Sequence, residues 1–285
     1  MKTFNFIVSN VDGEISVYNY LKLNNFSNVI ILKVKRGGIT VNERVAKTVD
    51  AVKNGDKISV TLPSEEVNKY ATPLNFPLRV LYDDEYFLAV FKPSGMVTHN
   101  GKTTGGFSLE NAVYYAYNNE FLFRPVNRLD KDTAGIVIIA KDAYSASLLG
   151  NIIKNGNLFK GYVGVLKGVP TKLKGEINAP IKDVKSGIKR VVASDGKPSI
   201  TKYEVVKVLP NGNSLCKFNL VTGRTHQIRV HTAHIGNPLY ADDLYGEKID
   251  GETYNLTCNE IEFTHPFTNI KIKITATTRQ KSKNA

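Results

Sequence analysis

The chain has 285 residues and a mass of 31.6 kDa, enough for one large domain or for a domain of about 200 residues with a small companion. Its composition, 42% hydrophobic and 22% charged, excludes a disordered or collagen-like chain, and no apolar run reaches the roughly 18 residues of a membrane span. Thirty-eight Lys and Arg against 26 Asp and Glu give a net charge of +12, which suggests a polyanionic partner but cannot choose between RNA, DNA and nucleotides. The N-terminus lacks the apolar block of a signal peptide, so we expect a cytoplasmic protein.

Residues 1–62 alternate short helix and strand signals and carry nine basic against five acidic side chains. A helix is predicted over 14–24, and Ser27 is placed to cap a second one that ends at Gly37 and Gly38. Short strands are predicted at 39–41 and 57–60. Residues 63–78 contain three prolines, which predicts an extended linker after this small unit.

From residue 79 to 277 the pattern is rich in strands. Apolar runs predict strands at 86–91, 136–140, 162–166, 202–209, 215–221, 261–263 and 270–274, and the clearest helices are 108–118 and 143–154. This order lacks regular βαβ alternation, so it predicts an α+β fold with a mixed, largely antiparallel sheet. The tail, 278–285, is expected to fray.

Signals for a cofactor are weak. The spacing from Gly95 to Gly101 is one residue too long for a phosphate-binding loop. The three histidines between 226 and 234 do not follow a known zinc pattern. Cys216 and Cys258 show neither metal nor redox spacing, so they are expected to be reduced thiols. We therefore predict no metal and no organic cofactor.

A polar segment at 128–135 lies between Pro125 and the buried run 136–140, where a rigid scaffold can display reactive groups. Asp130 is flanked by Arg128 and Lys131, whose positive charges favour its carboxylate form. Asp130 is therefore a candidate nucleophile or base. An ordinary turn with surface charges is the alternative.

A second segment, 220–231, carries two arginines and two histidines. Ile228 and Val230 alternate with Arg229 and His231, which predicts a strand that packs one face and presents Arg229 on the other. We expect the Arg229 guanidinium to form a bidentate, charge-assisted pair with the carboxylate of Asp130. The alternative is a basic strand face that contacts solvent or phosphate.

Together the two segments resemble the RluA-type pseudouridine synthases. That family has HRLDxxTSG where this chain has NRLDKDTAG at 127–135, and the family's TGRxHQIRxH is present in full at 222–231. Further matches, in the family's order, are Lys92-Pro93 with Gly95 and His99, Lys160-Gly161-Tyr162, and positions in 236–246 that include Asp242. The resemblance covers residues 79–277.

Two substitutions in the loop depart from the family pattern: Asn127 replaces His and Ala134 replaces Ser. They leave open a catalytically impaired RNA-binding protein of the same fold. Residues 1–62 resemble less closely an S-four-type RNA-binding module, whose arginine-rich helix start is replaced here by VIIL. A hydrolase that uses Asp130 as a base on an anionic substrate is a further alternative.

The resemblance implies an enzyme that isomerises uridine in ribosomal or transfer RNA to pseudouridine, without a cofactor, and we expect a monomer. It implies that Asp130 is the catalytic carboxylate, that Tyr162 stacks on the flipped uracil and that Arg229 orients Asp130. It also implies that Arg128 enters the space the base leaves. The remaining candidates for the RNA-binding and base-flipping site are Arg224, His226, His231, Lys92 and His99. Arg224, His226 and His231 are expected either to hold the segment of Arg229 or to touch RNA.

Overall fold

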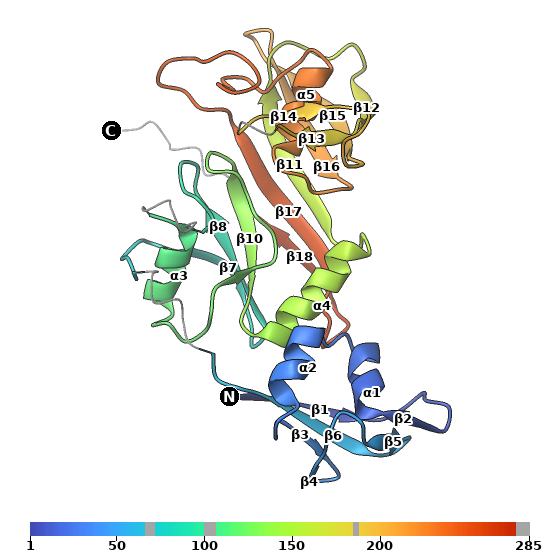
Figure 1. Cartoon of the computed structure of the whole chain (residues 1–285). Helices are drawn as coiled ribbons and strands as arrows, with labels where there is room; N and C mark the ends of the chain where they lie inside the picture. The colour runs from blue at the N-terminus through green and yellow to red at the C-terminus, as the bar shows by residue number, and fades with distance from the viewer. Residues whose placement is uncertain (66–71, 100–106, 185–187, 278–285) are drawn as a thin grey trace.

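The computed structural model describes residues 1–65, 72–99, 107–184 and 188–277, and these form two packed parts (Figure 1). In the N-terminal part, β1, β6, β3 and β4 form a sheet in that order, and β2 pairs with β5. Helices α1 and α2 lie on the side of this sheet that faces the rest of the chain (Figure 1). The elements are β1 (Lys2–Ile7), β2 (Glu14–Ser16), α1 (Val17–Leu23), α2 (Asn28–Val34), β3 (Ile39–Val41), β4 (Arg44–Val45), β5 (Ala51–Lys53) and β6 (Lys57–Leu62).

The C-terminal part is built on a long mixed sheet with the order β12-β15-β16-β11-β17-β10-β8-β7, to which β18 and β9 add at β17 and β10. Strand β10 is parallel to β17 and antiparallel to β8. The predicted mixed, largely antiparallel α+β fold is therefore confirmed. The strands are β7 (Arg79–Asp83), β8 (Phe87–Lys92), β9 (Arg124–Pro125), β10 (Ala134–Ala140), β11 (Phe159–Leu166), β12 (Lys174–Asn178), β13 (Ile181–Asp183), β14 (Arg190–Val192), β15 (Ile200–Val208), β16 (Ser214–Leu220), β17 (Leu256–Thr264) and β18 (Lys271–Thr275), and the helices are α3 (Leu109–Ala116), α4 (Ala143–Lys154) and α5 (Gln227–His234).

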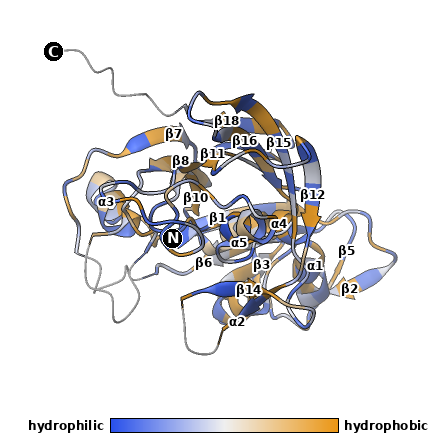
Figure 2. Cartoon of the chain, turned by 90° about the horizontal axis from the view of Figure 1, so that it is seen from above, coloured by the Kyte–Doolittle hydropathy of each residue, from blue (hydrophilic) through white to orange (hydrophobic). Residues whose placement is uncertain are grey.

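The central strands are apolar because both of their faces are covered. Residues 136–140 of β10 and 87–90 of β8 are fully buried, in agreement with their continuous apolar sequence. Along the outer strands, hydrophobic and hydrophilic stretches alternate (Figure 2). Gly135 marks a close approach of backbones: it has φ +123°, and a Cβ there would lie 2.2 Å from the carbonyl oxygen of Cys258 on β17. Cys216 and Cys258 are free and buried, as predicted.

Most predicted elements are present, with two differences. The helix predicted at 14–24 is shorter than expected, because its first three residues form β2. Ser16 ends β2 and caps α1 by accepting a hydrogen bond from Asn19 N at 3.2 Å. The strand predicted across 220–231 is wrong: β16 ends at Leu220 and α5 begins at Gln227. Parts of the predicted linker (66–71), of the glycine-containing segment (100–106) and the tail (278–285) lie outside the described residues. No helix in the described ranges is long and apolar enough to span a membrane.

Helix α4 joins the two parts. Asp142 caps it by accepting a hydrogen bond from Ser145 N at 2.7 Å, and the same carboxylate binds Lys2 Nζ of β1 at 3.0 Å. One acidic side chain thus fixes both the start of α4 and the edge of the N-terminal sheet. The N-terminal part is held by a direct contact as well as by the chain that follows it.

Tyr144 of α4 is the centre of this contact. Its ring stacks on Phe26 with centroids 3.9 Å apart, and its hydroxyl donates to the Asn24 carbonyl at 2.8 Å. One turn further along α4, Ser147 donates to the Asn25 carbonyl at 2.8 Å. Because Tyr144 and Leu148 belong to the apolar core of the N-terminal part, that core is completed by α4.

Replacing Tyr144 tests whether the two parts share a core. We expect Tyr144→Ala to lower the free energy of unfolding by about 3–5 kcal/mol, as for other buried aromatic side chains cut to alanine. Denaturant titration measures this loss. Tyr115→Ala is the control, because Tyr115 is 46% exposed on α3. Equal losses in the two variants would argue against the shared core.

Candidate active site

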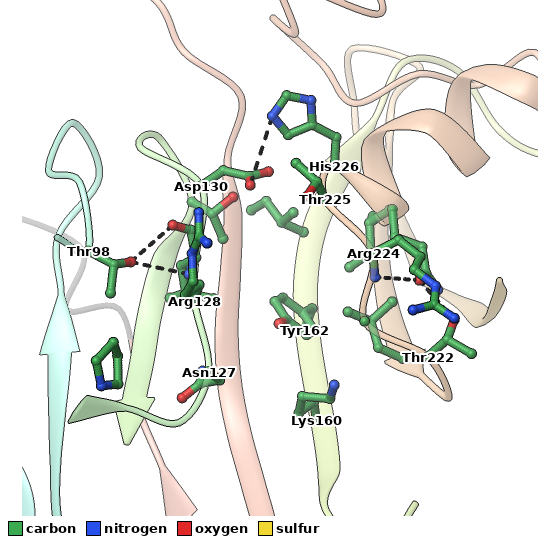
Figure 3. Close-up of a pocket in the computed structure, with 18 of the residues that line it drawn as sticks. Thr98, Asn127, Arg128, Asp130, Lys160, Tyr162, Thr222, Arg224, Thr225 and His226 are labelled. Atoms are coloured by element: carbon green, nitrogen blue, oxygen red, sulfur yellow. Dashed lines mark hydrogen bonds and ion pairs between the residues drawn. The ribbon is translucent and has the colours of Figure 1, made fainter. Parts of the chain in front are cut away.

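A pocket of about 990 Å³ collects most of the predicted site residues. Segments distant in sequence surround it, namely 97–99, 125–133 and 220–229, and β11 runs between them (Figure 3). The predicted residues that line it are Arg128, Asp130, Tyr162, Arg224, His226, Arg229 and His99. Lys92 and His231 are not among the residues that line the pocket.

Backbone contacts fix the loop that carries Asp130. The side chain of Asn127 donates to Ile136 O at 2.9 Å and accepts from Ile138 N at 2.8 Å, which ties the start of the loop to β10. Thr98 donates to Leu129 O at 3.1 Å through its hydroxyl (Figure 3). The Asp130 side chain remains 26% exposed. Asn127, which replaces the His of the family pattern, therefore holds the loop through these two hydrogen bonds.

Lys92 was predicted to contact RNA, and this is wrong because its side chain is fully buried. Its ammonium donates to the carbonyl oxygens of Met96, Pro93 and Lys131 at 2.6, 2.9 and 2.9 Å. Burial lowers the pKa of Lys92 to about 8, although the charges of Asp132 and Asp130 act in the opposite direction. Lys92 thus holds the backbone beside Asp130 from inside the protein.

His231 is also fully buried, so of the two roles expected for it, touching RNA is wrong and holding the segment of Arg229 agrees with its contacts. Its two ring nitrogens lie 2.9 Å from the Thr201 hydroxyl and 2.9 Å from the Ala179 carbonyl. Both nitrogens are therefore used to fasten α5 to neighbouring backbone and side chains. In the described ranges, no three His, Cys, Asp or Glu side chains gather as metal ligands would.

The predicted ion pair between Arg229 and Asp130 is replaced by a pair between Arg229 and Asp242. Arg229 Nε and Nη2 donate to the two carboxylate oxygens of Asp242 at 2.8 and 2.7 Å. The prediction failed because 227–234 is a helix and not a strand, so the side chain leaves the backbone in a different direction. Asp242 is fully buried in the turn that follows α5 and accepts further hydrogen bonds from Leu244 N and Tyr245 N at 3.0 and 3.1 Å.

Aromatic rings enclose the Arg229 guanidinium. Its central carbon lies 4.3 Å from the ring centroid of Tyr254 and 5.1 Å from that of Tyr245. Burial is the largest single influence and opposes the charge, but the hydrogen bonds to Asp242 together with the charges of Tyr254, Asp242 and Asp130 outweigh it, so the pKa of Arg229 is raised. Asp130 therefore lies in the field of a permanent positive charge without a bidentate bond to it.

His226 is a predicted residue that lies near Asp130: its Nε2 is 3.9 Å from Asp130 Oδ1 (Figure 3). It precedes α5 in the left-handed region, with φ 58°. Its Nδ1 lies 2.9 Å from the Tyr245 hydroxyl, which itself accepts from Arg190 N at 2.7 Å. Burial lowers the pKa of His226, and Asp130 only partly opposes this shift, so the imidazole is mainly neutral at pH 7.

The other predicted residues line the pocket with varied exposure. Arg128 and Arg224 are exposed, and Arg224 donates to Pro198 O through Nε and Nη2 at 3.3 Å each. His99 is partly buried, and its Nδ1 has no hydrogen-bond partner among the described residues. Exposed guanidinium groups at the rim are suited to bind phosphate.

Tyr162 and Lys160 project from the same side of β11 into the pocket (Figure 3). Tyr162 is only 6% exposed. Burial, a hydrogen bond with Cys258 and the charge of Asp130 raise the pKa of Tyr162 well above its usual value, so its hydroxyl is protonated at neutral pH. The sequence analysis named Lys160 and Asp242 only as matches to family motifs. It predicted no role for either residue.

Comparisons with known proteins agree with the geometry. Residues 86–234 match the family described as RNA pseudouridylate synthase. The chain is 35% identical over 256 residues to an uncharacterized RNA pseudouridine synthase of Mycoplasma genitalium, covering 86% of this chain and 82% of that one. It is also 35% identical over 235 residues to ribosomal large subunit pseudouridine synthase C of Rickettsia conorii, with 77% of each chain covered.

Solved structures share the fold. Human RNA pseudouridylate synthase domain containing 1 superimposes with a TM-score of 0.60 and 23% identity, covering 71% of this chain and 84% of that one. Human RNA pseudouridylate synthase domain containing 4 gives a TM-score of 0.58 and 18% identity, with 70% and 88% covered. The mixed sheet that carries the pocket is thus also found in these proteins.

The Arg229–Asp242 pair can be tested by its effect on stability. Arg229→Met should lower the free energy of unfolding by roughly 3–5 kcal/mol, because it leaves the Asp242 carboxylate buried without its partner. Arg229→Lys should be intermediate, since an ammonium cannot hold both oxygens. Arg224→Met, at an exposed position, is the control in the same denaturation experiment, with an expected change within about 0.5 kcal/mol. If Arg229→Met is as stable as this control, the pair does not stabilise the fold.

Proposed function

Because the chain belongs to the RluA-type family of RNA pseudouridine synthases, which are isomerases, we propose that Asp130 is the nucleophile with which it converts specific uridines into pseudouridine. The observation that carries this proposal is the position of Asp130. Its partly exposed carboxylate faces a large pocket, on a loop held by Asn127, Thr98 and Lys92.

The reaction rearranges one nucleoside. The bond from ribose C1′ to uracil N1 breaks, the base turns, and C5 bonds to C1′. Asp130 would either attack C1′ or assist loss of the C2′ proton to give a glycal, and both routes need a carboxylate shielded from water. No external reagent is consumed, so the proposed reaction needs no cofactor.

The surroundings of Asp130 support this role. The charges of Arg229 and Asp130 attract each other across the pocket, and the role proposed for Asp130 needs its carboxylate form, which is the form that can attack carbon. Exposed Arg128 lies two residues from Asp130 at the rim, where it can fill the space that a flipped base leaves in the RNA. Tyr162 offers a ring on which the uracil can stack.

The proposed substrate is ribosomal or transfer RNA. The net charge of +12 and the exposed guanidinium groups at the pocket rim favour a polyanion, and relatives from Rickettsia conorii and Buchnera aphidicola are named for the large ribosomal subunit. Residues 1–62 are proposed to add RNA affinity as an S-four-like module. A monomeric state and a cytoplasmic location remain predictions.

Replacing the carboxylate tests the central role. Asp130→Asn keeps the shape but loses the nucleophile, so we expect turnover to disappear while stability and RNA binding stay near wild type. RNA labelled with tritium at uracil C5 gives the readout, because pseudouridine formation releases that hydrogen. Asp132→Asn, two residues along the same loop, is the matched control. Residual activity of Asp130→Asn within about tenfold of wild type, a barrier change of only ~1.4 kcal/mol, would remove Asp130 from the central role.

Tyr162 is tested by separating its ring from its hydroxyl. We expect Tyr162→Phe to bind RNA normally and to lose about 10²-fold in kcat, because the ring remains while the group that can pass a proton is gone. Tyr162→Ala should lose the stacking as well. A fully active Tyr162→Phe with an inactive Tyr162→Ala would assign stacking alone. Activity in both variants would show that Tyr162 is not part of the site.

A further inference from the structure

Lys160 is a cation in the pocket whose charge has no partner among the residues that the structure describes. It is partly buried on β11, and no hydrogen bond or ion pair joins its ammonium to any described residue. Its Nζ reaches toward the 222–224 loop, where a Cβ on Gly223 would lie 3.2 Å away. An unpaired ammonium in a half-buried pocket is unfavourable, so a ligand that supplies negative charge is the natural partner.

The position of Lys160 relative to Tyr162 and Asp130 indicates which ligand atoms it meets. Lys160 and Tyr162 are two residues apart on one strand, so they are about 6.5 Å apart along the same face. In the close-up, Tyr162 lies between Asp130 and Lys160 (Figure 3). If the ribose lies at Asp130 and the uracil on Tyr162, the far edge of the base points toward Lys160.

We propose that Lys160 is a further catalytic residue, whose ammonium donates to a keto oxygen of the uracil while the base is detached from the ribose. This inference rests on the proposed function. On the route in which Asp130 attacks C1′, its carboxylate oxygen bonds to C1′ as the C1′–N1 bond breaks. The electron pair of the broken bond leaves with the uracil, which then carries one negative charge shared between N1 and the keto oxygens. The charge disappears when C5 bonds to C1′ and the carboxylate of Asp130 is released. The proton on C5 is then lost and N1 gains one.

A fixed cation beside this transient anion stabilises the step most when the charge is largest. In the free protein no described residue pairs with this cation, and burial lowers the pKa of Lys160. The group is therefore costly for the folded protein and useful only when the substrate is bound. Removing the charge should separate activity from stability, which removal of a structural lysine would not do.

The test compares full-length wild type, Lys160→Met and Lys160→Arg, with Lys217→Met on the exposed surface of β16 as the control. Unmodified large-subunit ribosomal RNA and transfer RNA transcripts, labelled with tritium at uracil C5, serve as substrates under single-turnover conditions. We expect Lys160→Met to reduce the rate constant at saturating enzyme by about 10²-fold. Lys160→Arg should retain activity within about tenfold, since it keeps the charge. The melting temperature of Lys160→Met should equal or exceed that of wild type.

The pH dependence gives an independent readout. Raising the pH deprotonates Lys160, so the wild-type rate should fall along the alkaline limb of the pH–rate profile. In Lys160→Arg this alkaline limb should move to higher pH, because a guanidinium stays charged.

Other results would overturn the inference. A weaker apparent RNA affinity with an unchanged saturating rate would assign Lys160 to a phosphate of the RNA. A clear drop in melting temperature together with activity would assign it a structural role. An active wild type and an equally active Lys160→Met would refute the role of Lys160 alone, whereas a wild type that releases no tritium from either RNA would refute the proposed function and this inference with it.

Discussion

The buried ion pair between Arg229 and Asp242 is the constraint on which the rest of the site depends. Both carboxylate oxygens are used, at 2.8 and 2.7 Å, and two tyrosine rings enclose the guanidinium. The pair fixes α5 against the turn that follows it. It also places a permanent positive charge near Asp130 without neutralising it by direct contact. Asp130 therefore remains open to a ligand in the pocket.

The loop around Asp130 is held both from the pocket wall and from inside the protein. Asn127, which lines the pocket, bonds to the backbone of β10, and the buried Lys92 donates to three carbonyl oxygens. These bonds allow the carboxylate to be rigid and exposed together, which catalysis by a preorganised group requires. The substituted Asn127 fits this arrangement.

Much of the fold could be predicted because its central strands are continuous apolar runs and its helices have clear caps. The run 136–140 and the helix from Ala143 to Lys154 are where the sequence placed them. The failures have a common cause. Ile228 and Val230 alternate as in a strand, but tertiary packing makes the segment a helix, and this turns Arg229 toward Asp242. Lys92 and His231 were candidates for RNA contact because they match family motifs, and a motif match does not show whether a polar side chain is buried with partners.

Asp130, Tyr162 and Lys160 would divide the proposed reaction between them, acting on the ribose, the ring face and the far edge of the uracil. The most direct measurement of the central role of Asp130 is a structure of the full-length protein bound to an RNA that it modifies. It should show a uridine flipped out of the RNA, with its ribose C1′ or C2′ in contact with the Asp130 carboxylate and its base on Tyr162. A bound uridine whose ribose lies against other residues, with Asp130 facing solvent, would contradict that role.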